Sequence, residues 1–295
     1  MSVSHPTADG AGHPGVWRYV EAQDAGAALP RRLAAVWRHQ RLLRRMAERD
    51  LRQRYVGSTL GFAWAAVHPL LFVAAYAFVF TFVFRGRLSP DSPAEQYMLY
   101  VVTGLLPWVA LSEVASKAAQ TMAEHRQLVK YVVFPVHILP LTSLYATAFS
   151  QLVGLSAVLV LTLWLRGGPD ASLLSLLLLV PIVVLQIAFL AGIAWLLGAI
   201  GAVWRDVKEL VQVVLTWGMF LTPIFYLERD LPAGLRPLVA VNPMAHLVGL
   251  YRDAFQGAGL QHPASLVVFG AVAVAVLLAG FLVFERVRVF LSDIL

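Results

Sequence analysis

Six long stretches of this chain contain no Asp, Glu, Lys or Arg, and this feature restricts its fold more than any other. They cover residues 55–84, 96–112, 131–165, 171–204, 210–227 and 254–284. A helix needs about 20 apolar residues to cross the hydrocarbon core of a bilayer. The sequence therefore predicts six transmembrane helices, over residues 61–84, 97–115, 138–165, 173–200, 210–227 and 265–284.

The composition supports an all-α polytopic membrane protein. Hydrophobic residues make up 59% of the 295 positions and charged residues 14%, whereas a soluble domain is about 45–50% apolar and about 25% charged. The chain has no cysteine, which excludes disulfides, thiolate metal sites and thiol nucleophiles.

The basic residues favour one orientation in the membrane. If both termini face the cytoplasm, 17 Lys and Arg residues lie inside and 6 outside. Cytoplasmic loops carry such an excess of basic residues in membrane proteins. We therefore expect cytoplasmic termini, and we attribute the net charge of +6 to topology and not to a nucleic-acid partner.

The N-terminal region divides into two predicted segments. Residues 1–29 are rich in Gly, Ala, His and Pro and predict a disordered cytoplasmic tail. Residues 30–54 place Leu43, Ala47 and Leu51 on one helical face with arginines around it. This pattern predicts an amphipathic helix in contact with membrane lipid at the cytoplasmic interface. The alternative is a cytoplasmic helix packed on a partner subunit.

A polar segment over residues 117–135 follows the second predicted span. It predicts a cytoplasmic coupling segment that contacts a soluble partner; an ordinary loop is the alternative. Its candidate contact residues are Glu124, Arg126, Lys130, Phe134 and Pro135.

The segment over residues 229–262 is long for a simple turn. Pro232 is a candidate start of one short helix, and Asn242 with Pro243 has the pattern of a helix cap followed by the first helical residue. We expect re-entrant helices that act as an extracytoplasmic gate, or else an amphipathic hairpin. The candidate gate residues are Pro232, Asn242, Pro243 and Tyr251.

The sequence contains no pattern of a catalytic or metal site. It has no GxxxxGK[ST] loop for ATP, no HExxH and no GxSxG. Apart from Glu113, the predicted spans lack the charged residues that ion-coupled carriers generally use. Aromatic residues are abundant there and are candidates to line a sugar channel, although some serve as interfacial anchors. The channel candidates are Trp64, Phe72, Tyr76, Trp217, Phe220, Phe225 and Tyr226.

Several strings, in order along the spans, resemble the permease subunit of type-2 ABC exporters for polysaccharides, the group of O-antigen, capsule and teichoic-acid exporters. The resemblance covers roughly residues 45–295. It rests on residues 50–55 (DLRQRY), 58–64 (STLGFAW), 104–108 (GLLPW), 130–135 (KYVVFP), 204–207 (WRDV), 221–226 (LTPIFY) and 242–244 (NPM).

This resemblance implies a homodimer in the bacterial inner membrane that binds two copies of a cytosolic ABC ATPase. ATP and magnesium would bind to that partner, and the substrate would be a lipid-linked polysaccharide. The sequence departs from the family at His68, where glutamine is usual, and at Thr222, where serine is common. The alternatives are a type-2 exporter of drugs or lipids, or a membrane-embedded transferase.

Overall fold

The computed structural model describes residues 38–53, 57–83, 88, 92–126, 135–166, 176–256 and 259–290. Every regular element in these ranges is helical, which confirms the predicted all-α class. The predicted tail over residues 1–29 lies outside the described residues, as do residues 30–37, Lys130 and Phe134. The elements in chain order are α3 (Gln40–Gln53), η1 (Gly61–Ala63), α4 (Trp64–Phe78), η2 (Val79–Val83), α5 (Ala94–Glu124), η3 (Val136–Ile138), α7 (Leu139–Arg166), α9 (Leu179–Val203), α10 (Val207–Leu221), η4 (Glu228–Asp230), α11 (Arg236–Val241), α12 (Pro243–Gln256) and α13 (Pro263–Arg288).

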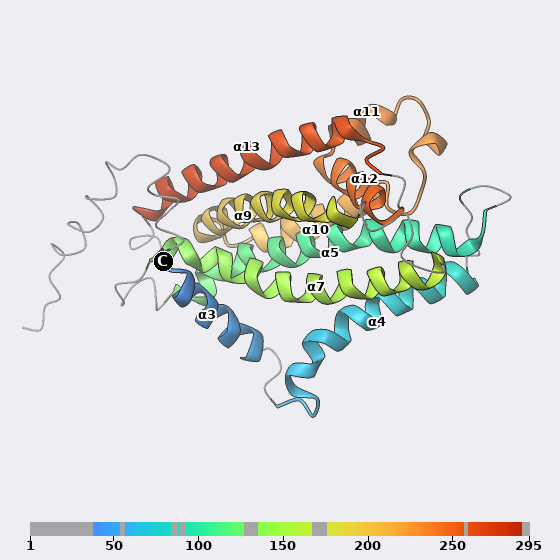
Figure 1. The fold of residues 1–295 in the computed structure, drawn as a ribbon. Helices are drawn as coiled ribbons and strands as arrows, with labels where there is room; N and C mark the ends of the chain where they lie inside the picture. Colours follow the sequence, from blue (N-terminus) through green and yellow to red (C-terminus); the bar gives the residue numbers. More distant parts are fainter. Residues whose placement is uncertain are drawn as a thin grey trace, which may run out of the picture.

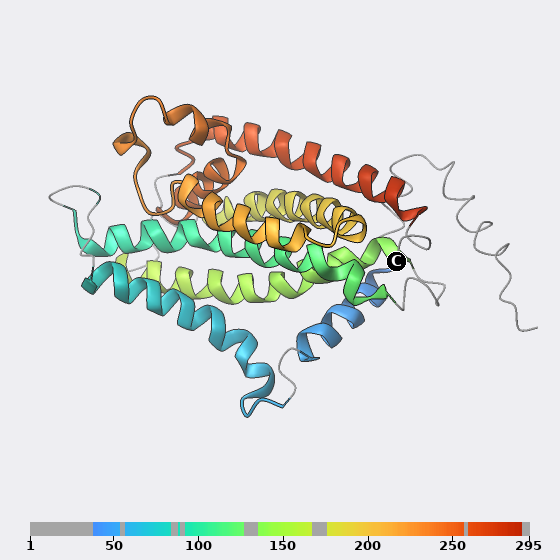
Figure 2. The ribbon, with the colours of Figure 1, turned by 180° about the vertical axis from the view of Figure 1, so that it is seen from behind.

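The long helices lie side by side around α5 (Figure 1). Helix α5 contacts α4, α7, α9, α10 and α12, and α13 packs along α9. The end of α13 lies near α3, whereas α11 and α12 lie at the opposite end, as the view from behind also shows (Figure 2). We call these the α3 end and the α12 end of the bundle. Helix α4 leans away from the bundle toward the α3 end.

Glycines allow α9 to approach its neighbours closely. A Cβ on Gly280 of α13 would lie 2.1 Å from the carbonyl oxygen of Gly192 in α9. A Cβ on Gly201 would lie 2.1 Å from the carbonyl oxygen of Ala119 in α5. Small residues at such crossings let helix backbones make van der Waals contact within a membrane. These positions therefore set the spacing of α5, α9 and α13.

Five segments of the described chain are long and apolar enough to cross a bilayer. The remaining predicted span, over residues 210–227, corresponds to α10, which has only 15 residues and ends at Leu221. Proline disfavours the helical conformation in the residue before it, and Thr222 before Pro223 is accordingly extended. The prediction of one continuous helix to residue 227 was therefore wrong. The five spans are Gly61–Val83, Ala94–Glu124, Val136–Leu165, Leu179–Val203 and Pro263–Arg288.

Helix α5 is much longer than the predicted span over residues 97–115. It has 31 residues and continues to Glu124 without a break. Alanines recur between residues 115 and 123 with neither glycine nor proline, and alanine is the strongest helix former. The first part of the predicted coupling segment is therefore the end of a membrane helix.

The apolar face of α3 packs on the protein itself. Ala47 and Leu51 are buried, and Leu51 clusters with Ala65 of the α4 region and Ala146 of α7. This edge of the predicted interface helix therefore contacts α7 and not lipid.

Two short helices, α11 and α12, occupy the predicted gate segment. Pro232 does not begin a helix, because α11 starts at Arg236 with Pro237 in its first turn. Asn242 caps α12 as predicted, since its Oδ1 accepts a hydrogen bond of 2.9 Å from the Met244 N–H, and Pro243 is the first helical residue.

Candidate functional site

Aromatic rings from α4 and η2 meet the turn that follows α10. The ring centroids of Phe72 and Tyr76 are 4.6 Å apart, and those of Tyr76 and Phe80 are 6.2 Å apart. Phe225 lies 5.7 Å from Phe80 with nearly parallel rings. We call Phe72, Tyr76, Phe80 and Phe225 the aromatic stack. All four side chains are partly buried and pack against the hydrophobic core of the bundle.

The structure brings together some of the predicted channel residues and separates others. Phe220 lies 6.4 Å from Phe225 and so borders the aromatic stack. Trp64 is at the start of α4, where its ring is 6.3 Å from His68. Trp217 is 67% exposed on α10, and Tyr226 is half-buried one residue beyond the stack.

The stack is attached to α5 by two tyrosines that the sequence analysis did not single out. The Tyr97 ring lies 5.7 Å from Phe80. Its hydroxyl donates a hydrogen bond of 2.6 Å to the carbonyl oxygen of Phe225, and the Tyr100 hydroxyl donates one of 2.8 Å to that of Tyr226. These bonds matter because a non-helical backbone within a membrane protein must find partners outside its own segment.

Arg252 of α12 binds the first half of the same turn. Its Nη2 donates hydrogen bonds to the carbonyl oxygens of Pro223, at 2.6 Å, and Ile224, at 3.1 Å. Its Nε donates to the carbonyl of Tyr100 at 3.3 Å, and the guanidinium lies 3.3 Å above the Tyr100 ring. Burial lowers the pKa of Arg252 to about 10, so it remains charged at neutral pH.

Four consecutive carbonyls, from Pro223 to Tyr226, thus each accept a hydrogen bond from α5 or α12. Asn242 adds another contact, because its Nδ2 donates to the Thr222 hydroxyl at 2.9 Å. The turn that carries Phe225 of the aromatic stack is therefore held in place by α5 and by the predicted gate segment. In the sequence Arg252 stands beside Asp253 and 29 residues after Pro223, so no local pattern indicated that it binds this turn.

Tyr251, a predicted gate residue, is fully buried between helices. Its hydroxyl accepts a hydrogen bond of 2.7 Å from Gln151 of α7 and donates one to Gln186 of α9. The Gln151 amide also donates to Gln186 at 2.8 Å. Burial raises the pKa of the Tyr251 hydroxyl, which keeps it protonated as a donor. Tyr251 thus connects α12 to the bundle.

Replacing Tyr251 with phenylalanine should lower the apparent melting temperature by about 3 °C, because the buried Gln186 and the half-buried Gln151 lose a hydrogen-bond partner worth about 1–2 kcal/mol. The measurement is thermal unfolding of the purified protein in detergent. Tyr145→Phe is the matched control, since Tyr145 is 40% exposed on α7. Equal shifts in both variants would contradict the role of the buried hydroxyl.

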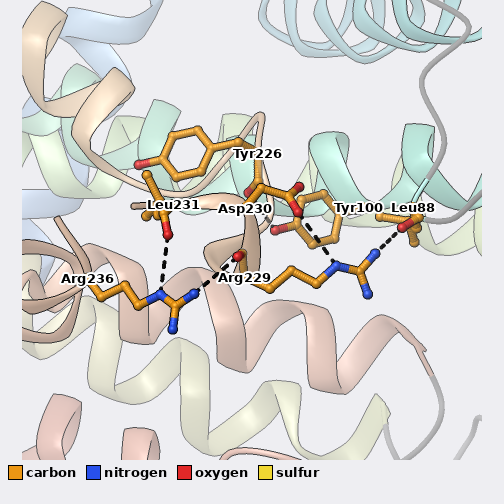
Figure 3. A network of polar contacts seen from close by, with 7 residues as sticks. All are labelled: Leu88, Tyr100, Tyr226, Arg229, Asp230, Leu231 and Arg236. Atoms are coloured by element: carbon orange, nitrogen blue, oxygen red, sulfur yellow. Dashed lines mark hydrogen bonds and ion pairs between the residues drawn. The ribbon is translucent and has the colours of Figure 1, made fainter. Parts of the chain in front are cut away.

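Polar contacts also fix the chain around α12. The buried Asp253 carboxylate accepts hydrogen bonds from the backbone N–H groups of Gln261 and His262 and contacts the His262 ring at 2.9 Å. Arg229 donates to the carbonyl of Leu88, and Arg236 donates to those of Leu231 and Arg229 (Figure 3). The Arg229 bond ties the η4–α11 region to the chain between α4 and α5, whereas the Arg236 bonds lie within that region.

At the α3 end, a cavity of about 490 Å³ lies between α3, α5 and α7. It is lined by charged residues of α3 and by Glu124 at the end of α5. Arg126 is exposed just beyond Glu124, and Pro135 directly precedes η3. The structure therefore places the start of the predicted coupling segment beside α3. Within the described residues, no three His, Asp or Glu side chains gather to hold a metal ion.

Comparison with known proteins is consistent with this architecture. Residues 41–255 match the family described as ABC-2 type transporter. The chain is 33% identical over 256 residues to the O-antigen export system permease protein RfbA of Myxococcus xanthus, which covers 86% of this chain and 95% of that protein.

Two other relatives are more distant. The O-antigen export system permease protein RfbA of Klebsiella pneumoniae is 26% identical over 85% of this chain and 93% of its own length. The polysialic acid transport protein KpsM of Escherichia coli is 22% identical over 74% of this chain and 82% of its own length.

Proposed function

The chain belongs to the ABC-2 type transporter family, and from this premise we propose that it is the permease subunit of an ATP-driven exporter of lipid-linked polysaccharide. The observation that carries the proposal is the likeness to an O-antigen export permease over 86% of this chain. The aromatic stack supports it, because ring faces bind sugars through repeated weak contacts that allow a long chain to move.

In this proposal the protein lies in the bacterial inner membrane with both termini in the cytoplasm, as the distribution of basic residues favours. The α3 end is then cytoplasmic and the α12 end extracytoplasmic. Helix α10, about 22 Å long by its 15 residues, completes a sixth crossing together with the turn that Arg252 holds. Helices α11 and α12 gate the exit.

We propose that two copies of the chain assemble with two copies of a cytosolic ABC ATPase. Helix α10 supports an interface between the copies, because it exposes Val213, Trp217 and Phe220 along one face. The ATPase binds at the α3 end, where α3 and the end of α5 form a charged surface. ATP and magnesium bind to the ATPase, so this chain is not itself an enzyme.

Reversing one charge at the α3 end tests the coupling. Glu124→Arg should weaken ATPase binding at least about tenfold, because like charges at an interface cost more than about 1.4 kcal/mol. The assay is co-purification with the cognate ATPase and glycan-stimulated ATP hydrolysis in proteoliposomes. Glu95→Arg, at the opposite end of α5, is the matched control. Equal complex formation by both variants would refute the coupling site.

The same proteoliposomes distinguish this proposal from an exporter of drugs or lipids. Lipid-linked glycan should stimulate ATP hydrolysis by the wild-type complex, whereas the lipid carrier without sugar should not. Stimulation by apolar drugs alone would favour the alternative.

A further inference from the structure

Asp253 of α12 is a buried acidic side chain that binds the chain just before α13. Only 3% of the side chain is exposed. Its Oδ2 accepts hydrogen bonds from the backbone N–H groups of Gln261, at 2.9 Å, and His262, at 2.8 Å. Its Oδ1 lies 2.9 Å from Nδ1 of the His262 ring. A buried carboxylate is costly unless its oxygens are paired, so these contacts fix the start of α13 against α12.

Adjacent residues of α12 thus hold two different segments of the chain. Arg252 binds the turn after α10 through the carbonyls of Pro223 and Ile224, whereas Asp253 binds the residues that lead into α13. Successive residues of a helix point about 100° apart, so one helix reaches both segments. The three elements meet at the α12 end of the bundle (Figure 1). A movement that separates α12 from α13 must break the contacts of Asp253.

The two sets of contacts differ in how they respond to pH. A guanidinium stays charged in proteins, whereas histidine is the side chain that ordinarily changes its charge between pH 5 and 8. The His262 side chain is 59% exposed, so its ring can exchange protons with the medium. A neutral ring donates an ordinary hydrogen bond from Nδ1 to the carboxylate. A protonated ring donates a charge-assisted bond, which is roughly twice as strong.

His262 and Asp253 line a cavity of about 540 Å³ between η4, α11, α12 and the start of α13. The other charged or titratable side chains that line it are Tyr100, Glu228, Arg229, Arg236, His246 and Arg252. Glu228 favours a protonated His262 ring and the arginines oppose it, so the direct contact with Asp253 decides the sign. His246 is engaged elsewhere, because its Nε2 donates to the Ala240 carbonyl at 2.9 Å and its Nδ1 lies 3.0 Å from the Ser265 hydroxyl.

We infer that His262 and Asp253 form a pH-sensitive latch that holds α12 to the start of α13, and that acid on the extracytoplasmic side keeps the gate closed. The latch follows from the contacts alone, whereas its sidedness and its effect on the gate rest on the proposed function. The closed latch binds a proton more strongly than the open one, because only the closed form places the imidazolium against the carboxylate. Acid therefore favours the closed form, and this contribution is lost as the pH rises.

Hydrogen exchange at residues 261 and 262 measures the latch directly, because both backbone N–H groups donate to Asp253. In the complex with its ATPase in nanodiscs, the protection of these amides, corrected for intrinsic exchange, should be about fivefold greater at pH 5.5 than at pH 8. His262→Asn keeps a donor near the position of Nδ1 but cannot take up a proton, so it should remove this difference. His246→Gln is the matched control and should retain it. Equal pH dependence in wild type and His262→Asn, or none in the wild type, would overturn the inference.

Transport tests whether the latch acts on the gate. ATP added outside proteoliposomes selects complexes whose α12 end faces the lumen. With the outer pH held constant, a lumen at pH 5.5 should slow glycan transport by the wild-type complex about fivefold relative to pH 8, and it should not slow transport by His262→Asn. Equal wild-type rates at both pH values would overturn the role in gating. A complex that transports no glycan at either pH would contradict the proposed function, whereas the exchange experiment requires no substrate and would still decide the latch.

Discussion

Replacing Arg252 with methionine should lower the apparent melting temperature by about 5–10 °C and abolish glycan transport. Methionine fills a similar volume but cannot donate to the carbonyls of Pro223 and Ile224. Each buried carbonyl left without a donor costs about 1–3 kcal/mol, and a shift of about 2–4 °C accompanies each kcal/mol in a protein of this size. The turn that carries Phe225 would lose its attachment to α12, so the aromatic stack would lose its position.

The measurement is thermal unfolding in detergent together with transport by the reconstituted complex. Arg236→Met is the matched control, because Arg236 is exposed and donates only at 3.3 Å to two loop carbonyls; we expect little change. Arg252→Lys should be more stable than Arg252→Met but less stable than the wild type. A lysine ammonium cannot reproduce the planar guanidinium that stacks on Tyr100 and donates several hydrogen bonds at once. Full recovery by lysine would show that charge alone suffices.

Replacing Gly280 with valine should prevent α9 and α13 from packing. Even the first carbon of the new side chain would lie 2.1 Å from the Gly192 carbonyl oxygen, and that atom belongs to a helix backbone that cannot rotate aside. Overpacking of a core costs about 1–3 kcal/mol and more where the backbone must move. We expect a fall in apparent melting temperature of about 5–10 °C or failure to accumulate in the membrane.

Gly249→Ala separates this effect from the loss of a glycine as such. Gly249 lies within α12, and a Cβ there would have no atom within 4 Å. Alanine favours helix over glycine by about 1 kcal/mol, so this variant should be at least as stable as the wild type. The close-packing argument would be wrong if the two variants behaved alike in thermal unfolding and in limited proteolysis of membranes.

Much of the fold could be predicted from residue type and spacing. Uncharged stretches of sufficient length located all five spans, because a bilayer core leaves few alternatives for an apolar segment of that length. Asn242 and Pro243 located the start of α12, because capping depends on neighbours in the chain. Pro223 also indicated that α10 ends before residue 227, because the residue before a proline disfavours the helical conformation.

The candidate site was harder to predict from the sequence than the fold. Glu113 and Lys117 stand one turn apart on α5 and form an ion pair of 3.2 Å, which their spacing allows but which the sequence analysis did not predict. A groove of about 650 Å³ between α4, α5 and α7 is lined by Glu113 and Lys117 together with Thr147 and Ser150 of α7, and only the packing of these helices brings them together. Likewise, Phe72, Phe220 and Phe225 were candidates by type, but their assembly around Phe80 depends on how α4 meets the turn after α10.

The sequence by itself thus determined the class, the membrane setting and the positions of the spans, because these depend on local composition and on the energy of placing a segment in lipid. Only the tertiary structure decided which side chains become partners. Arg252 meets Tyr100 across 152 positions, and Gly280 meets Gly192 across two helices. Such contacts depend on how helices pack, and within lipid that is decided by close van der Waals fit and hydrogen bonding between particular faces.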